Sequence, residues 1–521
     1  MASEPMTAED AAEDRLSDER VVADRVAKLA RLRERGVEPY GYSYDPTHHA
    51  AAALALFDAH EAAHGSDQEL AERVRVAGRI VSKRVMGKST FAHLSDRTGK
   101  IQLYFRVNDL GEAYGLLDLI DLGDWIGAEG TLFRTRTGEV SLKVAAFTLL
   151  SKGLRPLPFG KEETDPETGE RRVYSGFTDM EARYRQRYAD LAVNPEVRDV
   201  FVARAKVVTA CRRFLDERDF VEVETPVLQP LYGGALARPF VTHHNALDMQ
   251  LYLRIADELY LKRLIVGGME RVYEIAKNFR NEGLSRFHNP EFTMLEFYAA
   301  YMDYEDIMRL TEELLVHVVD SVLGGGPVKY GEHEIHFAPP FARFTMYEAI
   351  RDIGGVDVPA LDEDGLRDAV RKLGVSADEV KTMGRGRMID ELFGTLVEPK
   401  LIQPTFITDY PREMSPLAKP KRGDPELTER FELMLAGKEL LNAYSELNDP
   451  IDQRQRFEAQ KRLAAAGDEE TQPLDEDFLR AMEYGMPPTG GFGMGIDRLV
   501  RILLDQPSVR DVILFPTMRP E

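Results

Sequence analysis

Sulfur chemistry has little place in this sequence, because its 521 residues include a single cysteine, Cys211. A lone cysteine excludes an intramolecular disulfide and any metal site built from several cysteines. Long apolar runs are missing too: none approaches the roughly 18 residues that span a bilayer, and residues 50–57 form one of the longest. The first residues are acidic and lack the basic and apolar parts of a secretory signal. We therefore expect a soluble, cytoplasmic protein with no membrane partner.

Two common phosphate-binding motifs are also lacking, since the sequence contains neither G-x-G-x-x-G nor a Walker A motif. A nucleotide would have to be held in another way. Positive charge is in deficit, with 67 Lys and Arg against 89 Asp and Glu and a formal net charge of −22. This balance argues against a general nucleic-acid coat protein and against DNA as a partner. It still leaves room for a local basic patch.

Apolar residues make up 43% of the chain, which is ample for a large core. Helical spacing runs from Leu16 to Gly36, and a second helical stretch covers about residues 50–71. Alternating segments then predict five short strands with a helical insert at 110–119, which is the order of an OB-fold barrel. The expected strands are 74–81, 91–94, 101–105 and 124–129, with a fifth after a turn at 135–138.

The rest of the chain reads as an α+β region, because its strands come as neighbouring pairs and not in a βαβ series. Strands are expected at 250–255, 270–279 and 291–301, and a helical, acidic stretch between 324 and 394. Pro and Gly among charges make 152–178 a linker or surface loop. The predicted domains are a helical extension (1–71), an OB-fold domain (72–151), this linker or insertion (152–178) and a large domain on an antiparallel sheet flanked by helices (179–521).

Three short motifs occur in order within the large domain. The first is FVEVETP at 220–226, after a helix with apolar residues. The second joins FRNE at 279–282 to HNPEF at 288–292, and the third is GFGMGIDR at 491–498, before an apolar helix. Each alone has an ordinary explanation, such as an ion pair on one strand face or the tight packing of a glycine-rich strand. The three together, in this order, favour a functional origin.

Together these motifs resemble the three signature motifs of class II aminoacyl-tRNA synthetases, which hold ATP on an antiparallel sheet. The resemblance implies that Arg280 binds the α-phosphate and the amino-acid carboxylate, while Phe292 lies under the adenine and Arg498 over it. His288 would lie near the outer phosphates and Glu282 beside the adenine. The implied ATP-binding residues are Arg280, Glu282, His288, Phe292, Glu439 and Arg498, with Arg280 and Arg498 as the catalytic pair.

The resemblance sharpens to lysyl-tRNA synthetases of the bacterial type and extends from about residue 27 to the C-terminus. It rests on long runs such as GGALARPF at 233–240, THHNALD at 242–248 and KELLNAYSELND at 438–449. The sequence departs from the family in three places. Phe287 stands where the family has Arg, with Arg286 one residue earlier; Tyr444 replaces a frequent Phe; and residues 160–175 look like an insertion.

A chemical argument agrees with lysine as the substrate. Glu258, Glu296 and Glu446 all fall near the nucleotide motifs, and a site that collects carboxylates suits a cation, since buried charges must be paired. An aspartate or asparagine pocket would need Arg or Lys, and structural ion pairs among these Glu residues are the alternative. The resemblance places Gly234 and Glu258 at the α-amino end, Arg280 at the carboxylate, Asn442 and Tyr444 along the side chain, and Glu296, Tyr298 and Glu446 at the ε-ammonium.

Glu432 and Glu439 are seven residues apart, a spacing that by itself identifies nothing. In the resembling family the corresponding pair holds Mg²⁺ against the ATP phosphates, with up to three ions when ATP is bound. Hard oxygen ligands suit Mg²⁺. We therefore expect a magnesium site at Glu432 and Glu439.

The predicted barrel carries the local basic patch, with six Lys or Arg and one acid between residues 72 and 90. Such a stretch is more often a solvated strand face than a binding surface. The resemblance implies a second role, in which the barrel binds the anticodon of tRNA(Lys). Phe91 would stack on a base, Gln102 would read its edge and Arg84 would support the contact.

The resemblance thus implies activation of L-lysine with ATP to lysyl-adenylate, followed by transfer to the 3′ end of tRNA(Lys). It also implies a homodimer formed through the helix before residue 220 and the strand with Val221 and Val223. Two alternatives remain: a paralogue that lysylates another acceptor, such as a protein side chain, and a non-catalytic RNA-binding paralogue. Such lysylating relatives usually lack the barrel, and a non-catalytic one would have lost Arg280, Arg498 or Glu439.

Overall fold

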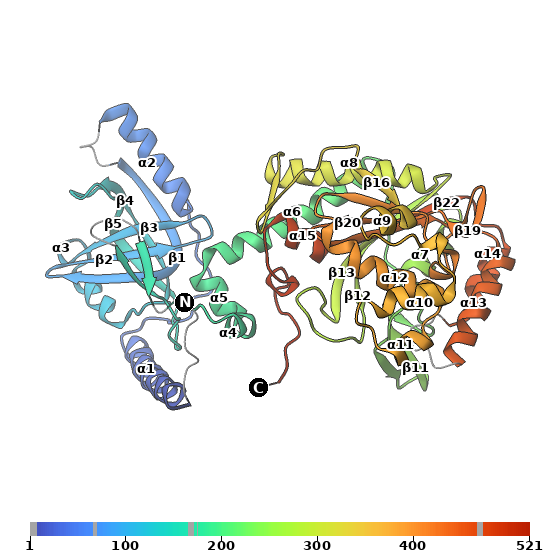
Figure 1. The fold of residues 1–521 in the computed structure, drawn as a ribbon. Coiled ribbons are helices and arrows are strands. Elements are labelled where there is room, and N and C mark those ends of the chain that lie inside the picture. Colours follow the sequence, from blue (N-terminus) through green and yellow to red (C-terminus); the bar gives the residue numbers. More distant parts are fainter. Residues whose placement is uncertain (1–7, 66–69, 165–170, 175, 466–472, 521) are drawn as a thin grey trace. The chain divides into compact units, whose positions relative to one another are not determined.

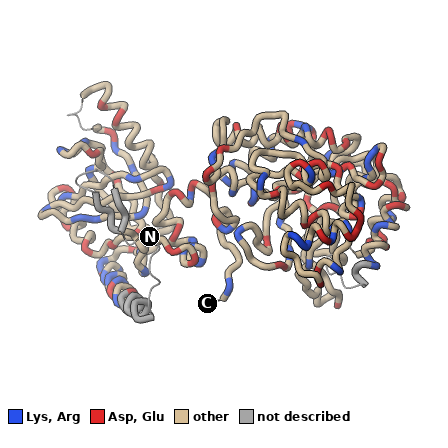
Figure 2. The backbone as a smooth tube through the Cα atoms, in the orientation of Figure 1, with Lys and Arg blue, Asp and Glu red and all other residues tan. Residues whose placement is uncertain are grey.

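The computed structural model describes residues 8–65, 70–164, 171–174, 176–465 and 473–520. The chain forms two compact units (Figure 1). The first contains the chain up to Arg183 together with Tyr188–Asn194, and the second contains Tyr184–Arg187 and the chain from Pro195 onwards. Basic and acidic residues alternate along both units, so the negative excess is not gathered in one segment (Figure 2). No helix within the described ranges is long and apolar enough to cross a membrane.

The first unit is built around a closed five-stranded barrel, which confirms the predicted OB-fold. The strands follow the order β1-β2-β3-β5-β4, and β3 runs parallel to β5 where the barrel closes. The predicted helical insert is a short turn of α-helix followed by a 3₁₀-helix, α3 (Val107–Leu110) and η1 (Gly111–Leu119). The strands are β1 (Leu70–Met86), β2 (Ser89–Ser95), β3 (Lys100–Arg106), β4 (Trp125–Arg134) and β5 (Val140–Ser151).

Alternation of apolar and polar residues builds the barrel wall. On β2, Ala92 and Leu94 are buried in the barrel core, whereas Phe91 and His93 are half-buried on the outer face. The second predicted helix is shorter than expected, because α2 spans Ala50–His64 and β1 already begins at Leu70. Gly65, with a φ of 92°, ends this helix, a conformation that residues with a Cβ rarely adopt.

Helix α1 (Ala8–Glu34) begins earlier than predicted and is tied to the barrel by charge. Arg25 donates from Nη1 to the Gly153 carbonyl at 2.9 Å, and Lys28 pairs with Asp121 at 2.7 Å. Behind them Lys152 makes a fully buried ion pair with Asp124 at 2.8 Å. These contacts anchor the helical extension to the end of the barrel.

The structure differs from the predicted linker or surface loop at 152–178. Two strands, β6 (Lys161–Thr164) and β7 (Arg171–Tyr174), pair antiparallel, and the residues between them lie outside the described ranges. Charged residues dominate both segments of the sequence, so it shows no apolar alternation that would predict a strand there. Two short helices follow, α4 (Met180–Arg185) and α5 (Arg187–Val193).

The second unit contains an eight-stranded sheet in the order β16-β17-β20-β21-β22-β13-β12-β8. Its central pairs are antiparallel, as predicted, while the pairs at both edges, β16 with β17 and β12 with β8, are parallel. The α+β class is confirmed. The strands are β8 (Val221–Glu222), β12 (Arg271–Phe279), β13 (Glu291–Ala300), β16 (Ala342–Thr345), β17 (Thr405–Thr408), β20 (Arg430–Leu435), β21 (Lys438–Ser445) and β22 (Thr489–Gly495).

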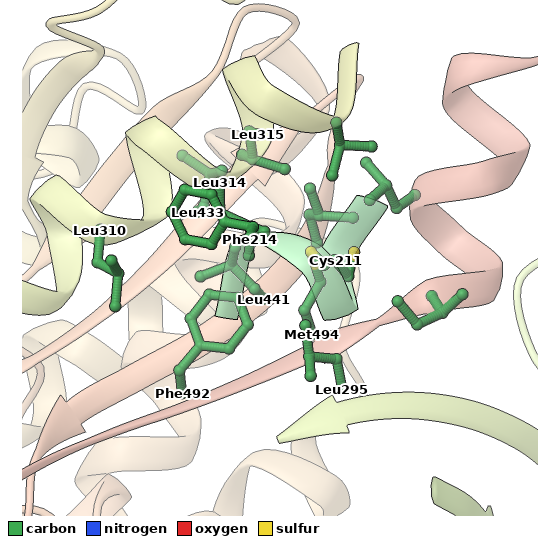
Figure 3. Close-up of a cluster of buried hydrophobic side chains, with 14 of the residues drawn as sticks. Cys211, Phe214, Leu295, Leu310, Leu314, Leu315, Leu433, Leu441, Phe492 and Met494 are labelled. Carbon is green, nitrogen blue, oxygen red and sulfur yellow. The ribbon is translucent and has the colours of Figure 1, made fainter. Parts of the chain in front are cut away.

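One face of this sheet packs against helices α6 (Pro195–Asp216), α8 (Tyr304–Leu323) and α15 (Ile496–Leu503). Figure 3 shows the resulting cluster, in which side chains from α6 and α8 meet side chains from the central strands. Cys211 lies inside it and is fully buried, and this burial raises the pKa of its thiol to about 12. The labelled members are Cys211, Phe214, Leu295, Leu310, Leu314, Leu315, Leu433, Leu441, Phe492 and Met494.

The stretch predicted to be helical between 324 and 394 begins with strands, because β14 (Val328–Tyr330), β15 (His333–Ile335) and β16 precede its first helix. Its helices then form a second core with Met434 of the sheet. They are α9 (Met346–Asp352), η2 (Val358–Ala360), α10 (Glu363–Arg371), α11 (Ala377–Thr382) and α12 (Arg385–Leu396). The 3₁₀-helix η3 (Glu398–Lys400) follows this stretch.

The remaining elements surround the other face of the sheet or its ends. Of these, α7 matters most for the site, because it contributes buried charged residues. They are β9 (Leu228–Gln229), β10 (Val241–His244), β11 (Met249–Leu253), α7 (Glu258–Val266), η4 (Arg412–Met414), β18 (Pro420–Lys421), β19 (Asp424–Thr428), α13 (Pro450–Ala465), α14 (Glu476–Glu483) and η5 (Val509–Asp511).

Candidate active site

A cavity of about 370 Å³ opens on the face of the sheet opposite the core of Figure 3. The period of two explains both faces: on β13, Leu295 and Phe297 enter the core, while Glu296 and Tyr298 line the cavity. The structure brings thirteen of the fourteen residues predicted for the large domain to this cavity and leaves Glu432 off its wall. The thirteen are Gly234, Glu258, Arg280, Glu282, His288, Phe292, Glu296, Tyr298, Glu439, Asn442, Tyr444, Glu446 and Arg498.

The glycines of the third motif lie on the cavity face of β22, between core residues Phe492 and Met494. A Cβ on Gly491 would lie 1.9 Å from Glu446 Oε1 and 2.7 Å from the Tyr298 ring. Residues with a Cβ cannot occupy that position without displacing one of these groups. Gly491 therefore makes room for two side chains of the protein itself.

Three carboxylates meet at the acidic end of the cavity, and a lysine of the chain lies among them. Lys262 is fully buried on α7, and its ammonium forms ion pairs with Glu258 Oε1 and Glu446 Oε2. Burial raises the pKa of Glu446, and the Lys262 ammonium opposes that rise. Neither oxygen of Glu446 accepts an aligned hydrogen bond from the described residues, so this carboxylate can still accept one from a ligand.

Glu296 is the third carboxylate, and Tyr298 donates to its Oε2 at 3.4 Å. Burial raises the pKa of Glu296 well above the usual value, and the neighbouring Asp257 raises it further. Asp257 itself is fixed by the Asn278 side chain, which donates to its Oδ1 at 3.0 Å. Two carboxyl groups this close favour a shared proton, which a cationic ligand would displace.

Tyr444 has a specific partner in this site. Its hydroxyl donates to Glu258 Oε1 at 2.6 Å, a bond that the Phe expected from the family could not make. Asn442, two residues earlier on the same face, accepts from Arg430 Nε at 2.9 Å. Arg430 was not predicted, yet it also lines the cavity. The wall between the two ends of the cavity is thus held by hydrogen-bonded side chains.

Another part of the cavity contains two arginines, Arg280 and Arg498, with the carboxylates of Glu282 and Glu439 beside them. The guanidinium of Arg280 lies 5.1 Å from the Phe292 ring centroid, and its Nε donates weakly to the Ile255 carbonyl at 3.4 Å. Arg498 donates from Nη1 to Glu439 Oε2 at 3.2 Å and lies 3.4 Å from His288 Nε2. Arginine pairs of this kind suit phosphate and carboxylate ligands, whose charge they can neutralise.

The departure at residue 287 has a structural counterpart. Phe287 lines the cavity, and the guanidinium of Arg501 lies 4.6 Å from its ring centroid, whereas Arg286 is exposed. Arg501 is one turn after Arg498 on α15 and is itself buried. Arg501 of α15 therefore places a guanidinium against residue 287, the position at which the family has an arginine.

Glu432 and Glu439 lie on the neighbouring strands β20 and β21. Burial raises the pKa of Glu432 to about 7, Arg430 opposes this rise and the Glu439 charge adds to it. Within the part of the chain that the structure describes, no group of three or more His, Cys, Asp or Glu could hold a metal. Glu432 contacts Arg430 and the Tyr410 hydroxyl, and Glu439 contacts Arg498, so a hard cation would share these carboxylates with them and take most of its ligands from phosphate and water.

The barrel residues form a second, separate cluster. Phe91 stacks on Tyr104 with centroids 4.7 Å apart and pairs across β1 with the exposed Arg84. On the same outer face Gln102 donates to Glu139 Oε2 at 2.6 Å and accepts from the Ser141 hydroxyl at 2.7 Å. The structure therefore brings Arg84, Phe91 and Gln102 together on one surface.

Several basic residues of β1 form ion pairs or hydrogen bonds within the protein. Arg73 pairs with Glu129 at 3.2 Å, Arg75 with Asp45 at 2.9 Å, and Lys83 donates to the Ile120 carbonyl at 2.8 Å. Arg84 and Lys88 are exposed. The local basic patch is thus confined to the strand ends beside Phe91.

Sequence reasoning missed Lys262, Arg430, Tyr104 and Glu139. Lys262 carried one available signal, since it follows Glu258 by four residues and therefore lies on the same side of α7. The contact between Lys262 and Glu446 carried no signal in the sequence, because 184 positions separate the two residues and only the fold brings them together.

Comparison with known proteins agrees with this geometry. Residues 179–519 match the family described as tRNA synthetases class II (D, K and N), and residues 74–150 match the OB-fold nucleic acid binding domain. A lysine–tRNA ligase of Pelotomaculum thermopropionicum is 53% identical over 95% of this chain and 94% of its own. Those of Carboxydothermus hydrogenoformans and Moorella thermoacetica are 51% and 52% identical over 96% of this chain and 98% of theirs.

Both units match, and the relatives are similar over nearly their whole length. The chain therefore belongs to the class II tRNA synthetases and, among them, to the family of the lysine–tRNA ligases.

Proposed function

We propose that the chain activates L-lysine with ATP to lysyl-adenylate, releasing pyrophosphate, and transfers lysine to the 3′ end of tRNA(Lys). The observation that carries this proposal is one cavity lined both by the carboxylates around Lys262 and by Arg280 and Arg498. Lysine has two ammonium groups and one carboxylate, and ATP adds only negative charge. The carboxylates therefore suit the amino acid's cations, and the arginines suit the phosphates.

The residues at the acidic end orient lysine. Gly234, whose φ of 84° and close approach to Glu258 require glycine, and Glu258 hold the α-ammonium. Glu296, Tyr298 and Glu446 hold the ε-ammonium, while Asn442 and Tyr444 line the side chain between them. The amino-acid carboxylate then faces Arg280, beside the bound α-phosphate.

Adenylate formation needs no nucleophilic side chain, because the lysine carboxylate attacks the α-phosphorus in line and pyrophosphate leaves. Arg280 neutralises charge on the α-phosphate, and Arg498 holds the nucleotide over Phe292, with Glu282 and His288 at its edges. Positioning and charge neutralisation supply the rate. Glu432 and Glu439 would hold Mg²⁺, up to three ions with ATP, which supplies positive charge to the phosphates. The reaction fits a cytoplasmic setting.

A paralogue that lysylates another acceptor remains the second candidate. The barrel favours tRNA as the acceptor, since paralogues that lysylate another acceptor usually lack a barrel. Its outer face carries Arg84, Phe91 and Gln102. Amino-acid-dependent pyrophosphate exchange with each of the twenty amino acids tests the substrate, and charging of tRNA(Lys) tests the acceptor. Exchange with lysine alone is expected; exchange with another amino acid, or none with lysine, would overturn the proposal.

We expect Phe91→Ala to weaken tRNA charging and to leave lysine-dependent pyrophosphate exchange unchanged. Loss of one base stack costs about 1–3 kcal/mol, or roughly a 5- to 150-fold higher KM for tRNA(Lys). Because Phe91 is half-buried on the outer face, its removal leaves the barrel core intact. Phe133→Ala, which removes another aromatic from the neighbourhood of Tyr104, is the control. Equal losses in both reactions would instead assign Phe91 to barrel stability.

The chain is expected to form an obligate homodimer. Val202 on α6 and Val221 on β8 are 55% and 50% exposed, and exposed apolar side chains on these elements favour a partner. Two-fold symmetry is the commonest way to cover such a surface. Sedimentation at assay concentrations should give twice the chain mass of 58.9 kDa. A fully active species at the single-chain mass would contradict this expectation.

A further inference from the structure

Lys262 contacts only one oxygen of each of its two acidic partners. Its ammonium takes Oε1 of Glu258 and Oε2 of Glu446, one oxygen from each carboxylate. The other oxygens face different walls of the cavity. Oε2 of Glu258 lies 3.6 Å from the point where a Cβ on Gly234 would be, and Oε1 of Glu446 lies 1.9 Å from the corresponding point on Gly491.

This arrangement connects the two ends of the proposed amino-acid site. Gly234 marks the α-ammonium end and Gly491 the ε-ammonium end, so each carboxylate offers a ligand the oxygen that Lys262 leaves. Lys262 is fully buried between them, with Nζ 5.9 Å from the Tyr298 centroid and 5.5 Å from the Tyr444 centroid. An ammonium enclosed in this way has little freedom to move. The separation of the two carboxylates is therefore fixed by one buried cation.

We propose that Lys262 is a positioning residue that sets the distance between the two ammonium sites and so selects the length of the amino acid. This inference rests on the proposed function. Glu258 lies on helix α7 and Glu446 directly follows strand β21, and Lys262 is the cation that joins them. A diamino acid with one methylene fewer has its two ammonium groups closer together, so a fixed separation of the two carboxylates disfavours it.

The ammonium also adjusts the charge of the site. Glu258, Glu296 and Glu446 line the acidic end, and Lys262 offsets one of their three charges. Two negative charges then remain for the two ammonium groups of the ligand. Without Lys262, three carboxylates would face each other in a buried site, and at least one would take up a proton.

Lys262→Met keeps an unbranched side chain that is one atom shorter and removes its charge. The KM for lysine in pyrophosphate exchange should rise about 10- to 100-fold, since a charge-assisted contact is lost, while kcat and the KM for ATP change by less than about threefold. A pocket distinguishes one methylene by about 10- to 200-fold, so the ratio of kcat/KM for lysine over ornithine should fall by about tenfold. Ornithine serves as the probe because it differs from lysine by that one methylene.

The pH profile gives a second readout. The titratable groups that interact with Glu446 are Lys262, Glu258, Tyr298 and Tyr444, and Glu296 lines the same cavity. In Lys262→Met the cation that lowers the pKa of Glu446 is gone, so more of this carboxyl is protonated at neutral pH. Raising the pH ionises it again. The KM for lysine should therefore fall more steeply in the variant than in the unaltered protein as pH rises from 7 to 9.

Arg263→Met is the matched control, because Arg263 follows Lys262 on α7 and pairs with Asp475 outside the cavity. It should leave the lysine-to-ornithine ratio unchanged. Equal losses with lysine, ornithine and ATP in Lys262→Met would show a purely structural role and overturn the proposal, as would an unchanged ratio.

If Lys262→Met does not fold, the double variant Lys262→Met/Glu446→Gln, which removes both charges, takes its place. It should show a lower ratio than Glu446→Gln alone, and an equal ratio overturns the proposal. Absence of lysine-dependent exchange in the unaltered protein would instead refute the proposed function.

Discussion

Gly491→Ala should lower kcat/KM for lysine in pyrophosphate exchange by about 100-fold or more. The new methyl group would lie 1.9 Å from Glu446 Oε1 and 2.7 Å from the Tyr298 ring, so the carboxylate must move. Movement of the Glu446 carboxylate is restricted, because it is buried and its other oxygen is held by Lys262. Overpacking and the displaced charge together cost about 3 kcal/mol, and they affect the site of the ε-ammonium directly.

Gly493→Ala is the matched control for this variant. Gly493 lies two residues further on the same face of β22, and a Cβ there would come within 3.3 Å of the flexible end of Met294. The lysine kinetics of Gly493→Ala should therefore change by only about threefold. Equilibrium binding of ATP should be similar in Gly491→Ala and the unaltered protein. Near-normal lysine activation by Gly491→Ala would remove Glu446 from the proposed binding site.

Glu446→Gln should raise the KM for lysine by about 10- to 100-fold and change ATP binding little. The amide keeps the shape of the carboxylate but loses its charge, which removes a charge-assisted contact worth about 1.5–3 kcal/mol. Lys262 is then left with Glu258 as its remaining acidic partner, which adds to the cost in a fully buried site. Initial rates of exchange over a range of lysine concentrations give this KM.

Glu291→Gln provides the comparison, because Glu291 is exposed on β13 and pairs with Lys277 at 3.5 Å outside the cavity. Exposed pairs contribute about 0–1 kcal/mol, so its kinetics should stay within a few-fold of normal. Unchanged lysine kinetics in Glu446→Gln would show that the ε-ammonium is bound elsewhere in the cavity.

Periodicity was enough to predict the barrel and the α+β class, whereas the residues of the cavity came from the resemblance to the class II synthetases that the three motifs carry. On β13 and β22 the period of two places motif residues on one face and apolar residues on the other, so the strand assignment alone predicts the side on which the site lies. Tyr298 and Glu296 follow from this rule without any knowledge of the fold.

Other features depend on contacts that the sequence does not encode locally. Lys262 looks like an ordinary polar residue of an amphipathic helix until α7 is placed against the end of β21. The β6–β7 pair lacks apolar alternation, so no periodicity signals it. Glu432 shares the strand face of Arg430, but that arginine and Tyr410 occupy its oxygens, which keeps it off the cavity wall.

The burial of Cys211 has a practical consequence for studying the chain in solution. With a pKa of about 12, only about one thiol in 10⁵ is ionised at neutral pH, and the side chain is enclosed by the core. A maleimide dye should therefore not react with Cys211 in the folded protein. A single cysteine introduced at the fully exposed Tyr42 would carry the fluorophore alone, and its signal on adding tRNA would report docking to the barrel unit without any other change to the sequence.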